Sequence, residues 1–205
     1  MAMKRNHFAN YTYREYLRDG RSVVIRAIRP DDQGLLVDAL GKISPQSLYF
    51  RLFSAKRKFT DDELKQVTAV DFVNIVALVA VMDKDGCEQI VGGGRYIRME
   101  PSGPGRSAEV AFLIDDAYQG LGIGSRIFKH LVGIARESGI TQFEAEVLPS
   151  NARMLKLFAR SGLPVAQTMT RDSAHVTIQL SAVEASPQTA QNPPLPPFDK
   201  GGTGG

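Results

Sequence analysis

The order of its elements predicts that this chain folds as a single α+β domain. Helical patterns come early, apolar strands arranged as hairpins follow them, and only one strand–helix–strand crossover is evident, over residues 108–148. The 205 residues, of which 43% are hydrophobic, suffice for one substantial core. A doubly wound α/β protein would instead alternate strands and helices along its whole length.

The first third of the chain predicts two strands followed by three helices. The turn Asp19-Gly20 separates the strands, and Pro30 followed by two acids is typical of a helix start. Thr60 and Glu63 have the spacing of a capping box, in which each side chain bonds the other residue's backbone N–H. The expected elements are strands 12–18 and 22–28, helices over 29–40 and from 44 onward, and a helix capped by Thr60.

The rest of the chain alternates apolar strands with two helices. Val73–Met82 is apolar and β-branched, as a buried strand should be, and a turn at 83–86 leads into its partner. Gly92-Gly93-Gly94 in that partner predicts a bulge or a close approach to the backbone. The expected elements are strands 73–82, 89–98 and 108–114, helix 122–138, strand 140–148, helix 150–161, and strands 164–170 and 174–180.

Composition divides the chain into three parts. Residues 1–21 form an N-terminal extension with the first strand, and residues 22–181 hold the folded domain. Residues 182–205 are rich in Ser, Pro, Gln, Thr and Gly, which predicts a disordered tail.

Charge and composition exclude several classes of function. The 25 Lys and Arg against 22 Asp and Glu give a net charge of +3, too mild for a nucleic-acid-binding surface. The single cysteine, Cys87, cannot form an intramolecular disulfide, and no apolar run has transmembrane length. The three histidines lack the spacing of metal ligands, and no signal peptide is evident. We therefore expect a cytoplasmic protein with no metal, membrane or nucleic-acid partner.

A glycine-rich turn joins a strand to a helix at Gln119–Gly124. Glycines let backbone N–H groups approach a ligand, and the helix N-terminus adds partial positive charge, so the turn suits a phosphate or diphosphate. A dinucleotide-binding motif would require G-x-G-x-x-G, where this chain has Ser125 at the last position, and a doubly wound domain around it. The alternative pattern is [Arg/Gln]-x-x-Gly-x-[Gly/Ala]. Gln119, Gly122 and Gly124 match all of its defined positions.

This segment resembles motif A of the GNAT N-acetyltransferases. Asn151, followed by Leu157-Phe158 and Gly162-Leu163, resembles the second motif of that family at the right distance downstream, and Arg29-Pro30-x-Asp32 resembles its first strand-to-helix entry. The resemblance covers about residues 22–181. It implies a GNAT fold, in which helices flank a mixed sheet splayed between two parallel strands, and acetyl-CoA as co-substrate.

A narrower resemblance concerns residues 43–53, 60–63 and 108–112, which are similar to bacterial Pat-type protein lysine acetyltransferases. It implies that the acceptor is a protein lysine, with AMP-forming acyl-CoA synthetases as targets. In Pat-type proteins the GNAT domain is often fused to a synthetase-like or cyclic-nucleotide-binding domain, whereas we expect these 205 residues to hold the catalytic domain alone.

The resemblance also implies which residues bind acetyl-CoA. Backbone amides of the turn hold the diphosphate, and an amide of the preceding strand polarises the thioester carbonyl. Asn151 either bonds the pantetheine or caps its helix, and Phe158 lies where many GNAT enzymes place the tyrosine that serves as general acid. Phenylalanine cannot donate a proton, so the thiolate would leave with help from water or another group. The implied binding residues are Phe112, Leu113, Ile114, Gln119, Gly120, Leu121, Gly122, Ile123, Gly124, Ser125, Asn151 and Phe158.

Glu109 is the candidate general base, because Pat-type enzymes place a catalytic glutamate ten residues before Gln119. A lysine amine has an ordinary pKa of about 10.4 and must lose a proton before it attacks, and a carboxylate beside it can accept that proton. The alternative is a solvated strand residue without a role, but the apolar neighbours of Glu109 favour a function.

Two other functions remain open from the sequence. A small-molecule amine acetyltransferase would use the same chemistry with a deeper acceptor pocket. A non-catalytic acetyl-CoA sensor would bind the cofactor and dock to a partner, and only Phe158 in place of tyrosine supports it.

Overall fold

The computed structural model describes residues 7–52, 60–100 and 106–180. At residues 50–52 it describes the backbone alone. The tail expected at 182–205 lies outside the described residues. No helix among the described residues is long and apolar enough to cross a membrane.

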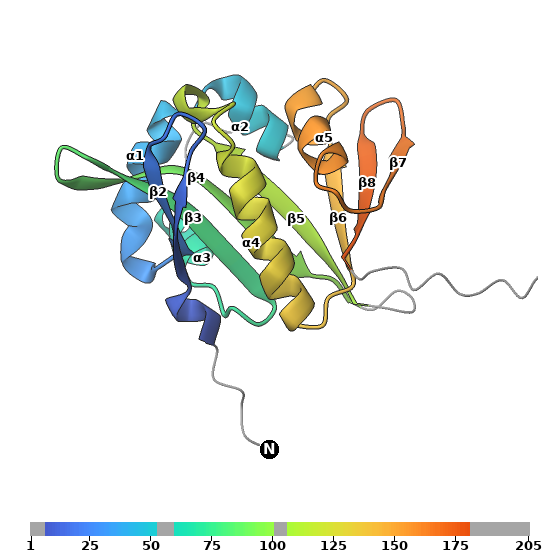
Figure 1. The fold of residues 1–205 in the computed structure, drawn as a ribbon, viewed down its shortest axis with the longest axis horizontal. Helices are drawn as coiled ribbons and strands as arrows, with labels where there is room; N and C mark the ends of the chain where they lie inside the picture. The colour runs from blue at the N-terminus through green and yellow to red at the C-terminus, as the bar shows by residue number, and fades with distance from the viewer. Residues whose placement is uncertain (1–6, 53–59, 101–105, 181–205) are drawn as a thin grey trace, which may run out of the picture.

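One mixed sheet of eight strands forms the centre of the molecule, in the order β1-β2-β3-β4-β5-β6-β8-β7 (Figure 1). All neighbouring strands are antiparallel except β5 and β6, which are parallel. The predicted α+β class is thereby confirmed. The strands are β1 (Thr12–Tyr16), β2 (Ser22–Ala27), β3 (Ile75–Lys84), β4 (Cys87–Arg98), β5 (Ser107–Ile114), β6 (Gln142–Val147), β7 (Val165–Met169) and β8 (Ala174–Gln179).

Helices cover both faces of this sheet. The long helix α4 crosses one face and α5 packs beside it, whereas α1 and α3 lie on the other face (Figure 1). The helices are α1 (Gln33–Lys42), α2 (Pro45–Leu52), α3 (Asp61–Thr68), α4 (Ile123–Glu137) and α5 (Ala152–Ala159), with 3-10 turns η1 (His7–Asn10), η2 (Pro30–Asp32) and η3 (Asp116–Tyr118).

Several predicted boundaries differ from the structure, and two of them differ for identifiable local reasons. The helix expected over 29–40 begins as the single 3-10 turn η2, because the Asp32 carboxylate accepts the Arg29 N–H at 2.7 Å and tightens the chain there. The strand expected from Val73 begins at Ile75, because the Asp71 carboxylate accepts the N–H groups of Val73 and Asn74 and holds them in a turn. The capping box of Thr60 and Glu63 is confirmed.

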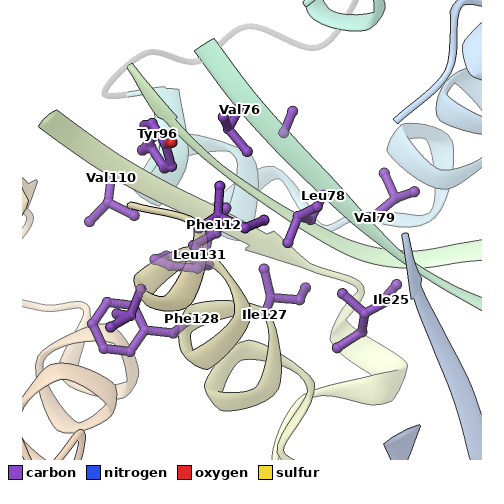
Figure 2. Close-up of a cluster of buried hydrophobic side chains, with 14 of the residues drawn as sticks. Ile25, Val76, Leu78, Val79, Tyr96, Val110, Phe112, Ile127, Phe128 and Leu131 are labelled. Atoms are coloured by element: carbon purple, nitrogen blue, oxygen red, sulfur yellow. The ribbon is translucent and has the colours of Figure 1, made fainter. Parts of the chain in front are cut away.

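The core lies between α4 and the sheet. Ile127, Phe128 and Leu131 of α4 pack against Phe112 of β5 and Leu78 of β3 (Figure 2). This contact depends on Gly92-Gly93-Gly94 in β4. A Cβ atom on Gly94 would lie 2.6 Å from Phe112 Cδ1 and 2.7 Å from Ile127 Cγ2. The register of β3 and β4 also shifts beside these glycines, so both consequences predicted for them are present.

A buried ion pair fixes the entry to α1. The Arg26 guanidinium donates to both Asp32 oxygens, at 2.8 and 2.7 Å, and both side chains are 3% exposed. Burial alone would raise the pKa of Asp32, but the hydrogen bonds and charge of Arg26 hold it below its ordinary value.

Candidate active site

A gap opens between the two parallel strands β5 and β6. Their pairing spans three positions and ends at Glu109 opposite Glu144, although β5 continues to Ile114 and β6 to Val147. The Asp115 N–H donates to Val91 of β4. Because backbone groups alternate in direction along a strand, the N–H groups of Phe112 and Ile114 face away from β4, into the gap, while that of Leu113 faces β4. An extended ligand could therefore bond to β5 at Phe112 and Ile114.

The glycine-rich turn at the end of β5 presents unpaired donors. Gly120 and Gly122 have φ of +82° and +91°, which glycine adopts without strain, and Gly122 is the residue that precedes α4. Within the described part of the chain, the six N–H groups of residues 120–125 donate to no protein acceptor. Unpaired N–H groups at the start of a fifteen-residue helix can bind an anion, so the turn has the donors that the predicted phosphate site requires.

The Gln119 side chain joins this turn to two helices. Its Nε2 donates to Asp116 Oδ1 at 3.1 Å and to Ser47 Oγ of α2 at 3.3 Å, and its Oε1 accepts a hydrogen bond from Arg153 of α5. Arg153 is exposed and brings a positive charge beside the turn. The sequence did not indicate this arginine, because 34 residues separate it from Gln119.

The two residues taken from the second motif differ in what they can contribute. The Asn151 carboxamide oxygen accepts the Met154 N–H at 3.2 Å, so Asn151 does cap α5, while its Nδ2 makes no hydrogen bond within the described residues. Phe158 is fully buried, and its ring packs against Phe112 and Phe128. Its ring therefore belongs to the core and offers no polar group to the gap.

Glu109 lies on the sheet face that α1 and α3 partly cover. It is exposed and shares this face with Ala111 and Leu113, since side chains alternate along a strand. Those two residues line an apolar cavity of about 170 Å³ beneath α1 and α3, together with Gly93 and Arg95 of β4. Glu109 therefore shares a sheet face with this cavity and lies where β5 and β6 begin to part.

Three polar side chains that the sequence analysis did not assign to the site share this face beyond β5. Glu144 is in register with Glu109, and Glu146 follows two residues later on β6. His175 of β8 lies opposite Glu146, with Nδ1 2.6 Å from Glu146 Oε1 and Nε2 3.8 Å from Glu144 Oε2. The alternation of these glutamates with buried Phe143, Ala145 and Val147 was the available signal. No group of three or more described His, Cys, Asp or Glu side chains is placed to hold a metal.

Comparison with known proteins places this geometry in a family. The sequence profile of the acetyltransferase (GNAT) family matches residues 48–163, more than half of the chain. The chain belongs to the GNAT family. GNAT enzymes are N-acetyltransferases that use acetyl-CoA, and the parting of β5 from β6 is the splay of the GNAT fold.

Individual relatives agree with this assignment. An acetyltransferase of Pseudomonas aeruginosa is 31% identical over 167 residues, which cover 82% of this chain and 88% of that protein. Acetyltransferase Pat of Mycolicibacterium smegmatis is 32% identical over 146 residues, which cover 71% of this chain and 42% of that protein. The structure of the GNAT domain of S. lividans PAT superposes with a TM-score of 0.74 at 32% identity, covering 82% of this chain and 96% of that domain. The chain is thus a GNAT acetyltransferase related to Pat proteins.

Proposed function

We propose that this GNAT enzyme transfers the acetyl group of acetyl-CoA to lysine side chains of a protein, with Glu109 as general base. The six free N–H groups of residues 120–125 carry the cofactor part of the proposal, because they can receive a diphosphate without losing a bond to the protein. The relatedness to Pat proteins supports a protein acceptor, and AMP-forming acyl-CoA synthetases are the class to test first.

Backbone donors and one carboxylate supply the chemistry. The pantetheine would lie along β5 in the gap and bond to the backbone of Phe112 and Ile114, and the Nδ2 of Asn151 is free to donate to it. One of the strand N–H groups would stabilise the negative charge that develops on the thioester oxygen. Glu109 would take one proton from the lysine ammonium, and the resulting free amine would attack the thioester carbon. The C–S bond breaks as the tetrahedral intermediate collapses, and the second proton lost by the nitrogen would reach the departing coenzyme A thiolate through water. Phe158 would take no part in proton transfer.

The open face beside Glu109 supports a cationic acceptor. Glu144 and Glu146 add two carboxylates on β6, beyond the gap. The Glu146 side chain is 49% exposed and the Glu144 side chain 20%, so an ammonium on a protein segment could approach them. A charge pattern of this kind favours lysine over a neutral amine.

The experiment is mass spectrometry of an acyl-CoA synthetase incubated with the protein and acetyl-CoA. The wild type should add 42 Da, about the mass of an acetyl group, to one or more lysines, and Glu109→Gln should reduce the rate about a hundredfold or more while acetyl-CoA still binds. Glu144→Gln tests the neighbouring carboxylate as a competing base. Glu100→Gln, at an exposed position that makes no hydrogen bond in the described part of the chain, is the matched control.

Acetyl-CoA binding without modification of the synthetase would refute the acceptor. A Glu144→Gln variant slower than Glu109→Gln would refute the assigned base.

A small amine is the second candidate acceptor, and the apolar cavity of about 170 Å³ favours it. The cavity lies on the same sheet face as Glu109 and could receive the apolar part of such a molecule. Turnover with a panel of arylalkyl and alkyl amines, in the absence of any protein acceptor, would support this alternative.

A further inference from the structure

The N-terminal hairpin touches the glycine-rich turn from the side of its carbonyl groups. Arg18, between β1 and β2, donates its N–H to Leu121 O at 3.3 Å and its Nη1 to Gly120 O at 3.2 Å. Arg126 of α4 donates its Nη1 to Gly122 O at 3.3 Å and its Nη2 to the Tyr16 carbonyl at the end of β1. The carbonyls of Gly120, Leu121 and Gly122 therefore all have donors, and the Arg18 and Arg126 side chains join the turn to the β1–β2 hairpin.

The N–H groups of residues 120–125 in the same turn, unlike its carbonyl groups, have no hydrogen-bond partner in the described part of the chain. Glycine has more backbone freedom than any other residue, so holding Gly120 and Gly122 in one conformation costs conformational entropy unless other groups fix it. Holding the carbonyls fixes the peptide planes, and this fixes the direction of each following N–H because the peptide unit is planar.

A partly buried polar cluster anchors the N-terminal segment to the helix that the turn begins. The Tyr11 hydroxyl lies 2.5 Å from His130 Nδ1, and His130 Nε2 lies 3.1 Å from Glu15 Oε1. Burial raises the pKa of Tyr11 to about 12, so its hydroxyl stays protonated and donates to Nδ1, which leaves the Nε2 proton for Glu15. Glu15 also lies 3.6 Å from Nε of Arg126, the residue that bonds the Gly122 carbonyl, so this polar cluster is connected to the contacts that hold the turn.

We propose that the N-terminal strand is part of the cofactor site: Arg18 is a positioning residue that holds the carbonyls of the glycine-rich turn so that its N–H groups face the diphosphate of coenzyme A. The proposal rests on the proposed function only in that acetyl-CoA is the ligand, and not on the acceptor. It also assigns a role to residues 7–21, which precede the region 48–163 matched by the family profile.

The test compares two ligands that differ in the diphosphate. Coenzyme A binding is measured by calorimetry, and binding of pantetheine, which lacks the diphosphate and the nucleotide, is measured from the initial slope of NMR chemical-shift changes. Arg18→Ala should raise the Kd for coenzyme A about threefold to tenfold and leave the pantetheine titration unchanged. Arg14→Ala is the matched control, since Arg14 is exposed on β1 and makes no hydrogen bond or ion pair in the described part of the chain.

A second variant separates positioning from a direct phosphate contact. Arg18→Gln keeps an N–H donor for the Gly120 carbonyl but has no charge, so it should recover most of the coenzyme A affinity if Arg18 positions the turn. A Gln variant as weak as Ala, with a loss that shrinks as salt is added, would overturn the positioning role in favour of direct charge pairing.

The remaining outcomes are also decisive. An unchanged Kd for coenzyme A in Arg18→Ala, or an equal loss for both ligands, would overturn the proposal. A wild type that binds no coenzyme A would refute the proposed function itself.

Discussion

Gly94→Ala should destabilise the fold at the contact that positions α4. The added Cβ would lie 2.6 and 2.8 Å from two atoms of the Phe112 ring and 2.7 Å from Ile127 Cγ2. Carbon atoms in a packed core lie about 3.5–4.0 Å apart, so each contact must open by about 1 Å. Phe112 and Ile127 are 3% and 0% exposed, and the Phe112 ring is wedged against Phe128 and Phe158, so neither side chain can turn aside.

The magnitude follows from two opposing effects. Overpacking of a core typically costs about 1–3 kcal/mol, and two obstructed side chains place Gly94→Ala near the upper end. Replacing glycine by alanine also reduces the entropy of the unfolded chain, which offsets about 0.4–1 kcal/mol. We therefore expect Gly94→Ala to lower the free energy of unfolding by about 2 kcal/mol. Displacement of α4 should also weaken coenzyme A binding, because the glycine-rich turn begins this helix.

Urea unfolding followed by circular dichroism measures the change, since the chain has no tryptophan to report by fluorescence. Gly93→Ala is the matched control. A Cβ there would meet Leu78 O at 3.3 Å and Val79 Cγ1 at 3.9 Å, on the face that borders the cavity, so its stability should change by less than about 1 kcal/mol. Equal stability of the Gly94→Ala and Gly93→Ala proteins would refute the reasoning.

Three further predictions concern buried charge, pH and the glycine-rich turn. Asp32→Asn should lower the free energy of unfolding by about 3 kcal/mol in urea titrations, because the buried Arg26 guanidinium then keeps only the exposed Glu88 carboxylate, at 3.2 Å, as a charge partner. Burial lowers the pKa of His130, so the folded chain resists a proton that the unfolded chain accepts; stability should fall as pH decreases below about 6.5, and His130→Gln should flatten that dependence in thermal melts. Gly122→Ala should weaken coenzyme A binding in calorimetry at least tenfold, because φ of +91° strains alanine and the new Cβ would lie 2.5 Å from Arg126 Nη1. Gly120→Ala should weaken binding less, because alanine there is strained by φ of +82° but its Cβ meets no atom within 4 Å.

The sequence by itself determined most of the secondary structure and the position of the glycine-rich turn. These are local properties: the apolar period distinguishes strand from helix, the Thr60 and Glu63 side chains cap a helix three residues apart, and glycine permits positive φ at Gly120 and Gly122. The short turn η3 and the 3-10 start of α1 escaped prediction, because three residues are too few to show a period.

Only the tertiary structure decided what these elements meet. Arg18 bonds to Gly120, 102 residues away in the sequence. Glu109 lies beside Glu144 because they are in register at the last paired position of the parallel strands β5 and β6. The Phe158 ring, on α5, packs in the core against Phe112 of β5 and Phe128 of α4. Such contacts depend on how strands and helices are arranged in space, and a period in the sequence fixes the face of each residue on its own element but not the partner across from it.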